Sequence, residues 1–442
     1  MKFPGYTRYK PSGVEWLGDV PEKWEVKRGR FTMRVNPPSP LLRALKPEDE
    51  VSFVPMDAVG VGGGLNLKQT RILADIAGGF TEFQDWDVVV AKITPCFENG
   101  KAALANGLVN KAALGTTELH VLRAGPTLNS SFLFYVAISD TFQKLGESEM
   151  YGAGGQKRVP PEFNKNFLIA YPHISEQQAI AEFLDREAAR LDALVAKKQT
   201  LIERLKEKRI ALISRTVTRG LNHKAKLKPS GIEWLGEIPA NWEAAQLRRK
   251  ALTLDCKHRT VSFVDDGIPL ASIREVHSFE VDLTDAKHTT EEEYHDLIEG
   301  DRRPHIGDII YSRNASVGDA AIVTTNQRFC MGQDVCLIRA PKHHPRYLIY
   351  LFRSNALIEQ VESLMIGSTF RRINVGQIKA FWICVPPLAE QIAIAEFLDH
   401  ETAKLDALVA KIETAVERLQ EYRTALITAA VTGKIDVRKA IA

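Results

Sequence analysis

The sequence predicts an α+β protein in which two mixed α/β domains are separated by an antiparallel coiled coil of two long helices. Two segments of the chain are written twice, and the second copies begin at nearly the same distance from the first. The blocks between the copies are similar in length but barely resemble each other. One frame used twice to present two different inserts indicates a protein that binds two unlike targets at a fixed separation.

The first repeated segment is a short leader that contains two tryptophans. Residues 10–25 return as residues 228–243, an offset of 228 − 10 = 218, with 11 of 16 positions identical. We expect the leaders to form extended arms over residues 1–23 and 221–241. Tryptophans in such apolar surroundings favour packing anchors over platforms that stack on nucleic-acid bases.

The two inserts follow the leaders and have a different character from the rest of the chain. Residues 24–171 and 242–386 contain short β-type runs broken by Gly, Pro, Asn and Asp. Residues 87–91 and 334–338 are examples, and shorter helical patterns such as 347–365 lie between such runs. We therefore expect two mixed α/β domains, each with a twisted, partly open sheet.

The second repeated segment is a long helix. Residues 176–218 return as residues 390–432, an offset of 390 − 176 = 214, with 29 of 43 positions identical. A capping pattern before the first copy and Gly220 after it mark its ends. Long helices are therefore predicted within residues 172–220 and 387–442.

Apolar residues in both helix copies recur at alternating steps of four and three, a heptad pattern sustained for more than four repeats. Because such a narrow stripe is not buried on a lone helix, we expect the two helices to pack on each other, antiparallel. About 40 residues would make a rod of about 60 Å, longer than one turn of duplex DNA. A coiled coil that serves only for dimerisation is the alternative. The leucines expected at the interface of the helix pair, or at contacts with partner proteins, are Leu184, Leu191, Leu194, Leu205, Leu212, Leu398, Leu405, Leu408, Leu419 and Leu426.

The distribution of charge is more informative than its total. The chain has 58 Lys and Arg against 55 Asp and Glu, a net charge of +3, which by itself does not indicate a nucleic-acid partner. Residues 186–228 nevertheless hold 13 Lys or Arg and 4 Asp or Glu. This run indicates a solvated helix face, contacts with phosphates, or an acidic protein partner.

Cysteine content and hydropathy exclude further classes. The five cysteines form no C-x-x-C pair, so we expect no disulfide, no metal site and a reducing, cytoplasmic location. Cys256 and His258 are possible zinc ligands by type, but no second ligand pair has matching spacing. No run of 18 apolar residues occurs, and the first residues lack the apolar core of a signal peptide.

Motifs that resemble catalytic ones are present but incomplete. Residues 36–39 (Asn-Pro-Pro-Ser) have serine where an amino-methyltransferase needs an aromatic ring to stack on the target base. Residues 60–64 (Gly-Val-Gly-Gly-Gly) lack the Lys-Ser/Thr of a P-loop. Residues 285–287 (Asp-Ala-Lys) have no evident upstream acidic partner for nuclease chemistry. We therefore expect no catalytic residue in this chain.

Several motifs together point to one family. The most specific are residues 386–399 (Pro-Pro-Leu-Ala-Glu-Gln-Ile-Ala-Ile-Ala-Glu-Phe-Leu-Asp), their first copy at 176–185, and residues 307–313 (Gly-Asp-Ile-Ile-Tyr-Ser-Arg). With these motifs and the Glu-Trp-Leu-Gly leaders, the chain resembles, over essentially its whole length, the specificity subunits of type I restriction-modification systems. The first insert departs from the family pattern, because Trp86 stands where the pattern has glycine. The first helix copy departs too, with residues 171–174 reading Tyr-Pro-His-Ile in place of Pro-Pro-Leu.

The resemblance implies two target recognition domains, each reading one half of a bipartite, asymmetric DNA sequence whose unread spacer is set by the long helices. It implies double-stranded DNA, two methyltransferase subunits and restriction subunits as partners. S-adenosylmethionine, ATP and Mg²⁺ would then bind to those partners, and this chain would bind no cofactor and catalyse no reaction. Two alternatives are a self-contained restriction-methylation enzyme with an unrecognised catalytic portion and a two-headed scaffold that binds proteins.

Two loops in each insert carry residue types that can read base edges, and these residues are the candidates for DNA binding. Arg and Lys bind guanine, and Asn and Gln bind adenine. Phosphate contact or simple solvation is the alternative for each residue. The loops before the last strand align at the 214 offset and carry Gln156, Lys157 and Arg158 in the first insert and Thr369, Arg371 and Arg372 in the second. The second pair of loops carries Lys92, Thr94 and Lys101 in the first insert and Arg313, Asn314 and Ser316 in the second.

Overall fold

The computed structural model describes residues 3–76, 78–153, 155–314, 317–365 and 372–440 and forms two compact units. Unit 1 comprises Met1–Gln199 and Thr414–Ala442, and unit 2 comprises Thr200–Glu413. Both long helices, α5 (Ile174–Arg219) and α10 (Leu388–Val431), contribute one part to each unit. The boundaries between the units therefore lie inside the two long helices. The segments predicted from the sequence (1–23, 24–171, 172–220, 221–241, 242–386 and 387–442) instead have their boundaries at the helix ends.

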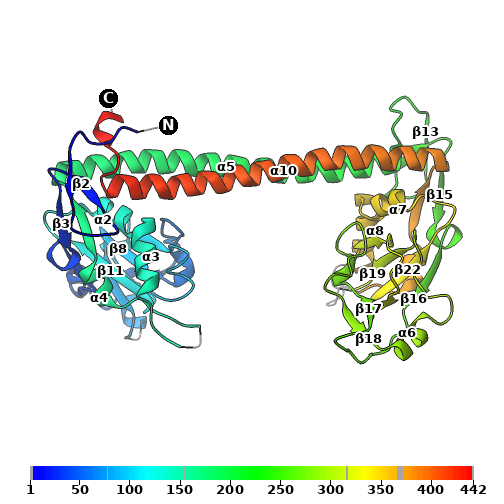
Figure 1. Ribbon diagram of the computed structural model, residues 1–442, viewed down its shortest axis with the longest axis horizontal. Helices are drawn as coiled ribbons and strands as arrows, with labels where there is room; N and C mark the ends of the chain where they lie inside the picture. Colours follow the sequence, from blue (N-terminus) through cyan, green and yellow to red (C-terminus); the bar gives the residue numbers. More distant parts are fainter. Residues whose placement is uncertain (1–2, 77, 154, 315–316, 366–371, 441–442) are drawn as a thin grey trace. The chain divides into compact units, whose positions relative to one another are not determined.

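Unit 1 contains one mixed α/β domain built on two four-stranded sheets (Figure 1). One sheet has the order β4-β11-β8-β9 and is antiparallel throughout, and the other has the order β6-β5-β10-β7 with β5 and β10 parallel. The pair β3-β12 joins the two ends of the domain. The strands are β1 (Tyr9–Pro11), β2 (Asp19–Pro21), β3 (Glu25–Arg28), β4 (Met33–Val35), β5 (Glu50–Val54), β6 (Thr70–Ile72), β7 (Thr81–Gln84), β8 (Asp87–Ala91), β9 (Ala102–Leu104), β10 (Ala112–Gly115), β11 (Leu119–Ala124) and β12 (Leu168–Tyr171). The shorter helices are α1 (Pro40–Arg43), α2 (Ser130–Ala137), α3 (Asp140–Ser148) and α4 (Pro161–Asn166).

Unit 2 repeats this plan with different loops. Its four-stranded sheet has the order β16-β22-β19-β20, the counterpart of β4-β11-β8-β9, and β15-β23 is the counterpart of β3-β12. A three-stranded sheet β18-β17-β21, with β17 and β21 parallel, replaces the second sheet of unit 1. The strands are β13 (Leu227–Pro229), β14 (Glu237–Pro239), β15 (Glu243–Gln246), β16 (Leu252–Asp255), β17 (Ile268–Ala271), β18 (Lys287–Thr289), β19 (Ile309–Ser312), β20 (Ala320–Ile322), β21 (Cys330–Met331), β22 (Val335–Arg339) and β23 (Trp382–Val385). The shorter helices are α6 (Glu291–Ile298), α7 (Pro345–Phe352), α8 (Asn355–Met365) and α9 (Val375–Lys379).

The long helices pair in antiparallel fashion inside each unit, as predicted. In unit 1 the first turns of α5 share a core with the last turns of α10, so that Leu184 and Leu426 belong to one apolar cluster. In unit 2 the last turns of α5 share a core with the first turns of α10, which brings Val217 and Leu398 into one cluster. The α+β fold class and the pairing of the two repeats are thus confirmed.

The helix seam is the row of residues through which α5 and α10 pack on each other. Its register differs from the predicted one. Of the predicted leucines, Leu184, Leu191, Leu205, Leu398 and Leu426 are buried and Leu212, Leu405 and Leu419 are half-buried. Leu194 and Leu408 are 37% and 44% exposed, however, so their assignment to the seam is wrong. Val195 and Val409, one position later, are the half-buried residues. The residue that follows Leu184 in the seam is Ala188, and the one that follows Leu398 is Thr402, four positions later in each case. Because alanine is small and threonine is polar, the hydrophobic pattern did not reveal these positions.

Two of the four leader tryptophans are buried in the cores of their domains, whereas Trp16 is 36% exposed and Trp234 is half-buried. Trp24 and Trp242 are both 1% exposed and belong to the main cores of units 1 and 2. This confirms the prediction of packing anchors for these two residues. Among the described residues, no helix combines the length and apolar content required to cross a bilayer.

Candidate nucleic-acid interface

The two loops predicted to bind DNA in the first domain form one continuous surface. The backbone N–H of Thr94 donates to the carbonyl of Lys157 at 3.0 Å, which joins the β8–β9 loop to the loop before β12. Gln156 and Lys157 are exposed, and Arg158 is half-buried. Arg158 pairs with Glu118 at 2.7 Å, and this ion pair lowers the pKa of the Glu118 carboxyl. Gln156 and Lys157 are therefore the side chains of this loop that remain open to a ligand.

Other predicted residues of the first domain have partners within the domain. The hydroxyl of Thr94 donates to Glu98 Oε1 at 2.9 Å, and the Lys101 ammonium donates to the carbonyl of Met56 at 2.9 Å. Lys92 is half-buried and lines a cavity of about 430 Å³ next to Arg43 and Glu82. Thr94 and Lys101 thus shape the β8–β9 loop, whereas Lys92 faces open space.

The second domain brings its own two loops together at the same place in the frame. Asn314 forms a β-bridge with Arg372, and the N–H of Ile373 donates to the carbonyl of Arg313 at 2.9 Å. Arg372 is exposed and lies 3.4 Å from Asp334. The predicted residues Ser316, Thr369 and Arg371 lie outside the described residues.

Arg313 does not belong to an accessible DNA surface, contrary to its prediction. Its side chain is 3% exposed and pairs with Asp255 at 3.1 Å. Its guanidinium also donates to the Cys256 thiol at 3.4 Å. The sequence motif that ends in this arginine is therefore a structural feature, because Arg313 directly follows strand β19 and its side chain is buried inside the domain.

Asp255, Cys256 and His258 lie close enough to share a metal ion, with their ligand atoms within 4.8 Å of one another. The guanidinium of Arg313 already lies against the carboxylate and the thiol. Burial also raises the pKa of Cys256, which opposes formation of the thiolate that a metal requires. These three side chains therefore suit the guanidinium of Arg313 better than a metal ion.

Two buried ion pairs that sequence reasoning missed fix the ends of the central strands. Arg123 binds both carboxylate oxygens of Asp87 at 2.7 Å, and Arg339 binds Asp308 at 2.8 and 3.0 Å. These pairs tie the start of β8 to β11 and the start of β19 to β22. The sequence feature that could have indicated these pairs is the aspartate, Asp87 or Asp308, that precedes each valine- or isoleucine-rich run.

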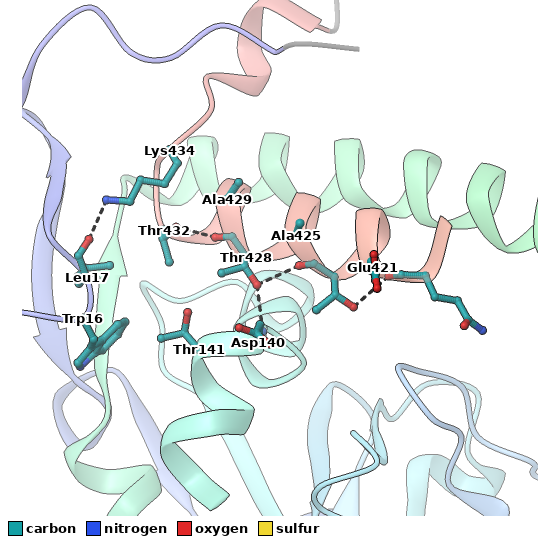
Figure 2. Close-up of a pocket in the computed structure, with 12 residues that line it drawn as sticks. Trp16, Leu17, Asp140, Thr141, Glu421, Ala425, Thr428, Ala429, Thr432 and Lys434 are labelled. Carbon is teal, nitrogen blue, oxygen red and sulfur yellow. Dashed lines mark hydrogen bonds between the residues drawn. The ribbon is translucent and has the colours of Figure 1, made fainter. Parts of the chain in front are cut away.

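A groove of about 770 Å³ lies beside α10 in unit 1 (Figure 2). One wall carries Thr424, Thr428 and Thr432, whose hydroxyls donate to carbonyls four residues earlier on the helix. The Thr428 hydroxyl also accepts from the N–H of Asp140 at the start of α3. Trp16 forms part of the opposite wall. The threonine hydroxyls of this wall are thus all bound to backbone groups.

Comparison with known proteins agrees with this architecture. Residues 282–418 match the sequence family described as the type I restriction modification DNA specificity domain. The type I restriction enzyme MjaVIII specificity subunit of Methanocaldococcus jannaschii is 24% identical over 440 residues, which cover 95% of this chain and 94% of that protein. Residues 282–418 thus match a type I DNA specificity domain, and nearly the whole chain is similar to a type I specificity subunit.

Other members match over shorter regions or by fold alone. The EcoAI specificity subunit of Escherichia coli is 38% identical over 164 residues, 37% of this chain but only 27% of that protein. The HsdS subunit from Thermoanaerobacter tengcongensis has a TM-score of 0.56 at 17% identity, with 94% of this chain and 98% of that chain covered. A chain from a type I R-M system studied for complex assembly has a TM-score of 0.73 at 18% identity, covering 94% and 99%. Both structures share the fold of this chain.

Proposed function

We propose that this chain reads a bipartite, asymmetric DNA sequence, one half with each domain. The observation that carries the proposal is the pair of adjoining loops found at the same place in both domains. The pair is formed by the β8–β9 loop with Lys157 in unit 1, and by the β19–β20 loop with Arg372 in unit 2. Equivalent positions with different side chains are what two unlike half-sites require.

The side chains that remain exposed at these loops suit a DNA ligand. Gln156 has the amide that pairs with adenine, and Lys157 and Arg372 carry charges suited to guanine or phosphate. The ion pair between Arg372 and Asp334 is 3.4 Å long and the Arg372 side chain is 52% exposed, so a phosphate or base can replace it at little cost.

We propose that the chain performs no catalysis itself and binds two methyltransferase subunits and restriction subunits. S-adenosylmethionine, ATP and Mg²⁺ would bind to those partners. Two features of the described residues support this view. Cys256 and Cys336 are buried with raised thiol pKa values, and His120 is buried with both ring nitrogens hydrogen-bonded within the domain. These groups are unsuited to act as nucleophile or general base.

A domain exchange tests the proposal. Residues 24–171 would be replaced by the same region of another specificity subunit, and the methylated sequence would be mapped in cells that supply the methyltransferase subunits. We expect one half of the methylated motif to change and the other half to stay the same. A change in both halves, or in neither, would contradict the assignment of one half-site to each domain.

The purified chain provides a second measurement. Incubated alone with labelled S-adenosylmethionine and duplex DNA, it is expected to transfer no methyl group. Transfer by the chain alone would support a self-contained methylation enzyme instead. Binding of the assembled complex to DNA is expected to weaken steeply as salt rises, because counterions are released from the phosphates.

A further inference from the structure

One arginine in each long helix lies in the row of seam residues and forms the same ion pair. Arg209 and Arg423 are equivalent in the two helix copies, since 423 − 209 = 214. In unit 1 the Nε of Arg423 lies 3.0 Å from Asp192 Oδ1 on the other helix. In unit 2 the Nε of Arg209 lies 3.0 Å from Asp406 Oδ1. The aspartates are equivalent as well, since 406 − 192 = 214, so one cross-helix contact is built twice.

In unit 1 the arginine also connects the helix pair to the β8–β9 loop. The Nη2 of Arg423 donates to the carbonyl of Gly62 at 3.1 Å. The N–H of Gly62 in turn donates to the carbonyl of Gly100 at 2.9 Å, and Val61 forms a β-bridge with Lys101. Residues 60–64 therefore connect Arg423 to the β8–β9 loop at the proposed DNA surface. These are the glycine-rich residues that lack the Lys-Ser/Thr of a P-loop.

In unit 2 an aromatic contact makes the corresponding connection. The guanidinium carbon of Arg209 lies 5.9 Å from the centre of the Phe279 ring, and that of Arg353 lies 4.5 Å from the same ring. Arg353 is mostly buried, and its Nη2 donates to the carbonyls of His277 and Ala320 at 3.0 Å each. Ala320 is the first residue of β20, so this chain of contacts reaches the end of the β19–β20 loop.

We propose that Arg423 and Arg209 are positioning residues that hold the DNA-facing loops at a fixed angle to the helix pair of their own unit. Through this they determine how strictly the complex measures the number of unread base pairs between the half-sites. The inference rests on the proposed function. Neither arginine needs to touch DNA, because each acts through the loop that it holds.

The magnitudes support a role in spacing. Adding one base pair moves a half-site by about 3.4 Å along the duplex and turns it by about 35°. An apolar core is not directional and resists such a rotation weakly. A charge-assisted hydrogen bond weakens steeply when its angle changes. The hydrogen bond from the Arg423 guanidinium to the Gly62 carbonyl is therefore suited to oppose the rotation that a wrong spacer demands, and the ion pair with Asp192 holds the same guanidinium beside α5.

Replacement by methionine separates this role from a purely structural one. A partly buried ion pair contributes little net stability compared with an apolar side chain of similar size. The Asp192 and Asp406 side chains are each 57% exposed, so water solvates them when the arginine is absent. We therefore expect Arg423→Met and Arg209→Met to fold and to assemble with the methyltransferase subunits. Arg418→Met and Arg204→Met, at exposed positions of α10 and α5, are matched controls.

The experiment uses the full chain assembled with its methyltransferase subunits. Methyl transfer would be measured on duplexes that carry both half-sites with the native spacer, with one base pair fewer and with one more. The wild type is expected to prefer the native spacer strongly. In each methionine variant the rate on the altered spacers, relative to the native one, is expected to rise about tenfold, while the two controls keep the wild-type ratio.

An unchanged ratio in both methionine variants, with methylation at the native spacer retained, would overturn the inference. Gly62→Ala provides a second test for unit 1, because the added Cβ would lie 3.1 Å from Arg423 Nη1 and the guanidinium would have to shift; the φ of +65° at Gly62 also strains the backbone of an alanine there. An unchanged ratio in Gly62→Ala would overturn the inference even if Arg423→Met failed to assemble. If the wild type itself ignored one half-site, the proposed function would fail, and not only this inference.

Discussion

At the scale of single residues, charged and polar side chains inside each domain shape the loops that reach the surface. Asp87 with Arg123 and Asp308 with Arg339 are bound through two or more hydrogen bonds at the same strand ends in both domains. Arg313 points inward from the adjacent strand. The backbone carbonyl of Arg313 accepts from the N–H of Ile373, so this buried arginine adjoins the segment from which Arg372 projects.

Arg313 and Arg372 provide a direct comparison of a structural and a surface arginine. Arg313→Ala is expected to lower the free energy of unfolding by about 2 kcal/mol, less than for a fully buried pair because the Asp255 side chain is 34% exposed. Arg372→Ala should change it by no more than about 0.5 kcal/mol but weaken DNA binding by the complex. Urea unfolding and DNA titration measure the two effects. Equal stability losses would contradict the assignment of these roles.

His120 makes the stability of the first domain depend on pH. Its Nδ1 accepts from Asn36 at 3.2 Å and its Nε2 donates to the carbonyl of Val159 at 2.8 Å, so the folded ring is neutral. Burial lowers the pKa of His120 below its usual 6.5. The unfolded chain therefore takes up the proton first, and stability present above pH 6.5 is lost as pH falls toward the lowered value.

The control for this pH dependence is His120→Gln, which removes the titrating group. Urea unfolding of the wild type is expected to show a falling midpoint from pH 6.5 to 5, and the variant should show a smaller fall. Parallel curves for the two proteins would mean that His120 does not account for the acid dependence.

At the scale of elements, the register of the long helices decides which residues form the seam. Leu191 is 2% exposed in unit 1, whereas Leu194 is 37% exposed three positions later on α5. The two leucines are a matched pair because they have the same side chain on the same helix.

Leu191→Asp is expected to lower the free energy of unfolding by about 3 kcal/mol or more and to abolish assembly with the methyltransferase subunits. Leu194→Asp should leave unfolding nearly unchanged, because its carboxylate stays in water. If Leu194→Asp nevertheless blocked assembly, α5 would contact the partner through this exposed position. Thermal unfolding and co-purification together distinguish these outcomes.

The sequence predicted the architecture better than the site, for physical reasons. The duplicated helices and leaders were evident because repetition and heptad spacing are properties of the chain itself. The seam register was wrong at Leu194 and Leu408 because burial on a helix pair depends on the partner helix, and small seam residues such as Ala188 give no hydrophobic signal. Arg313 was misplaced because the sequence does not reveal that the position after β19, a strand whose four residues are all buried, is covered as well. Arg209 and Arg423 were missed because their partners are distant in sequence.

At the scale of the whole molecule, unit 2 is one continuous stretch of chain, Thr200–Glu413, whereas unit 1 needs two stretches. Residues 200–413 expressed alone are therefore expected to unfold in one cooperative thermal transition. Residues 1–199 alone should lack such a transition, because Ile180 and Leu184 lose the α10 residues that share their core. Circular dichroism of both fragments would measure this, and cooperative melting of residues 1–199 would contradict the shared core.

The same division imposes an order of events during translation. A ribosome completes unit 2 before it has made residues 414–442, which supply the rest of unit 1. Until then the apolar face of α5 in the nascent first half is exposed to solvent. Chaperone capture at this stage, and aggregation of truncated products, are the hazards that such a design invites.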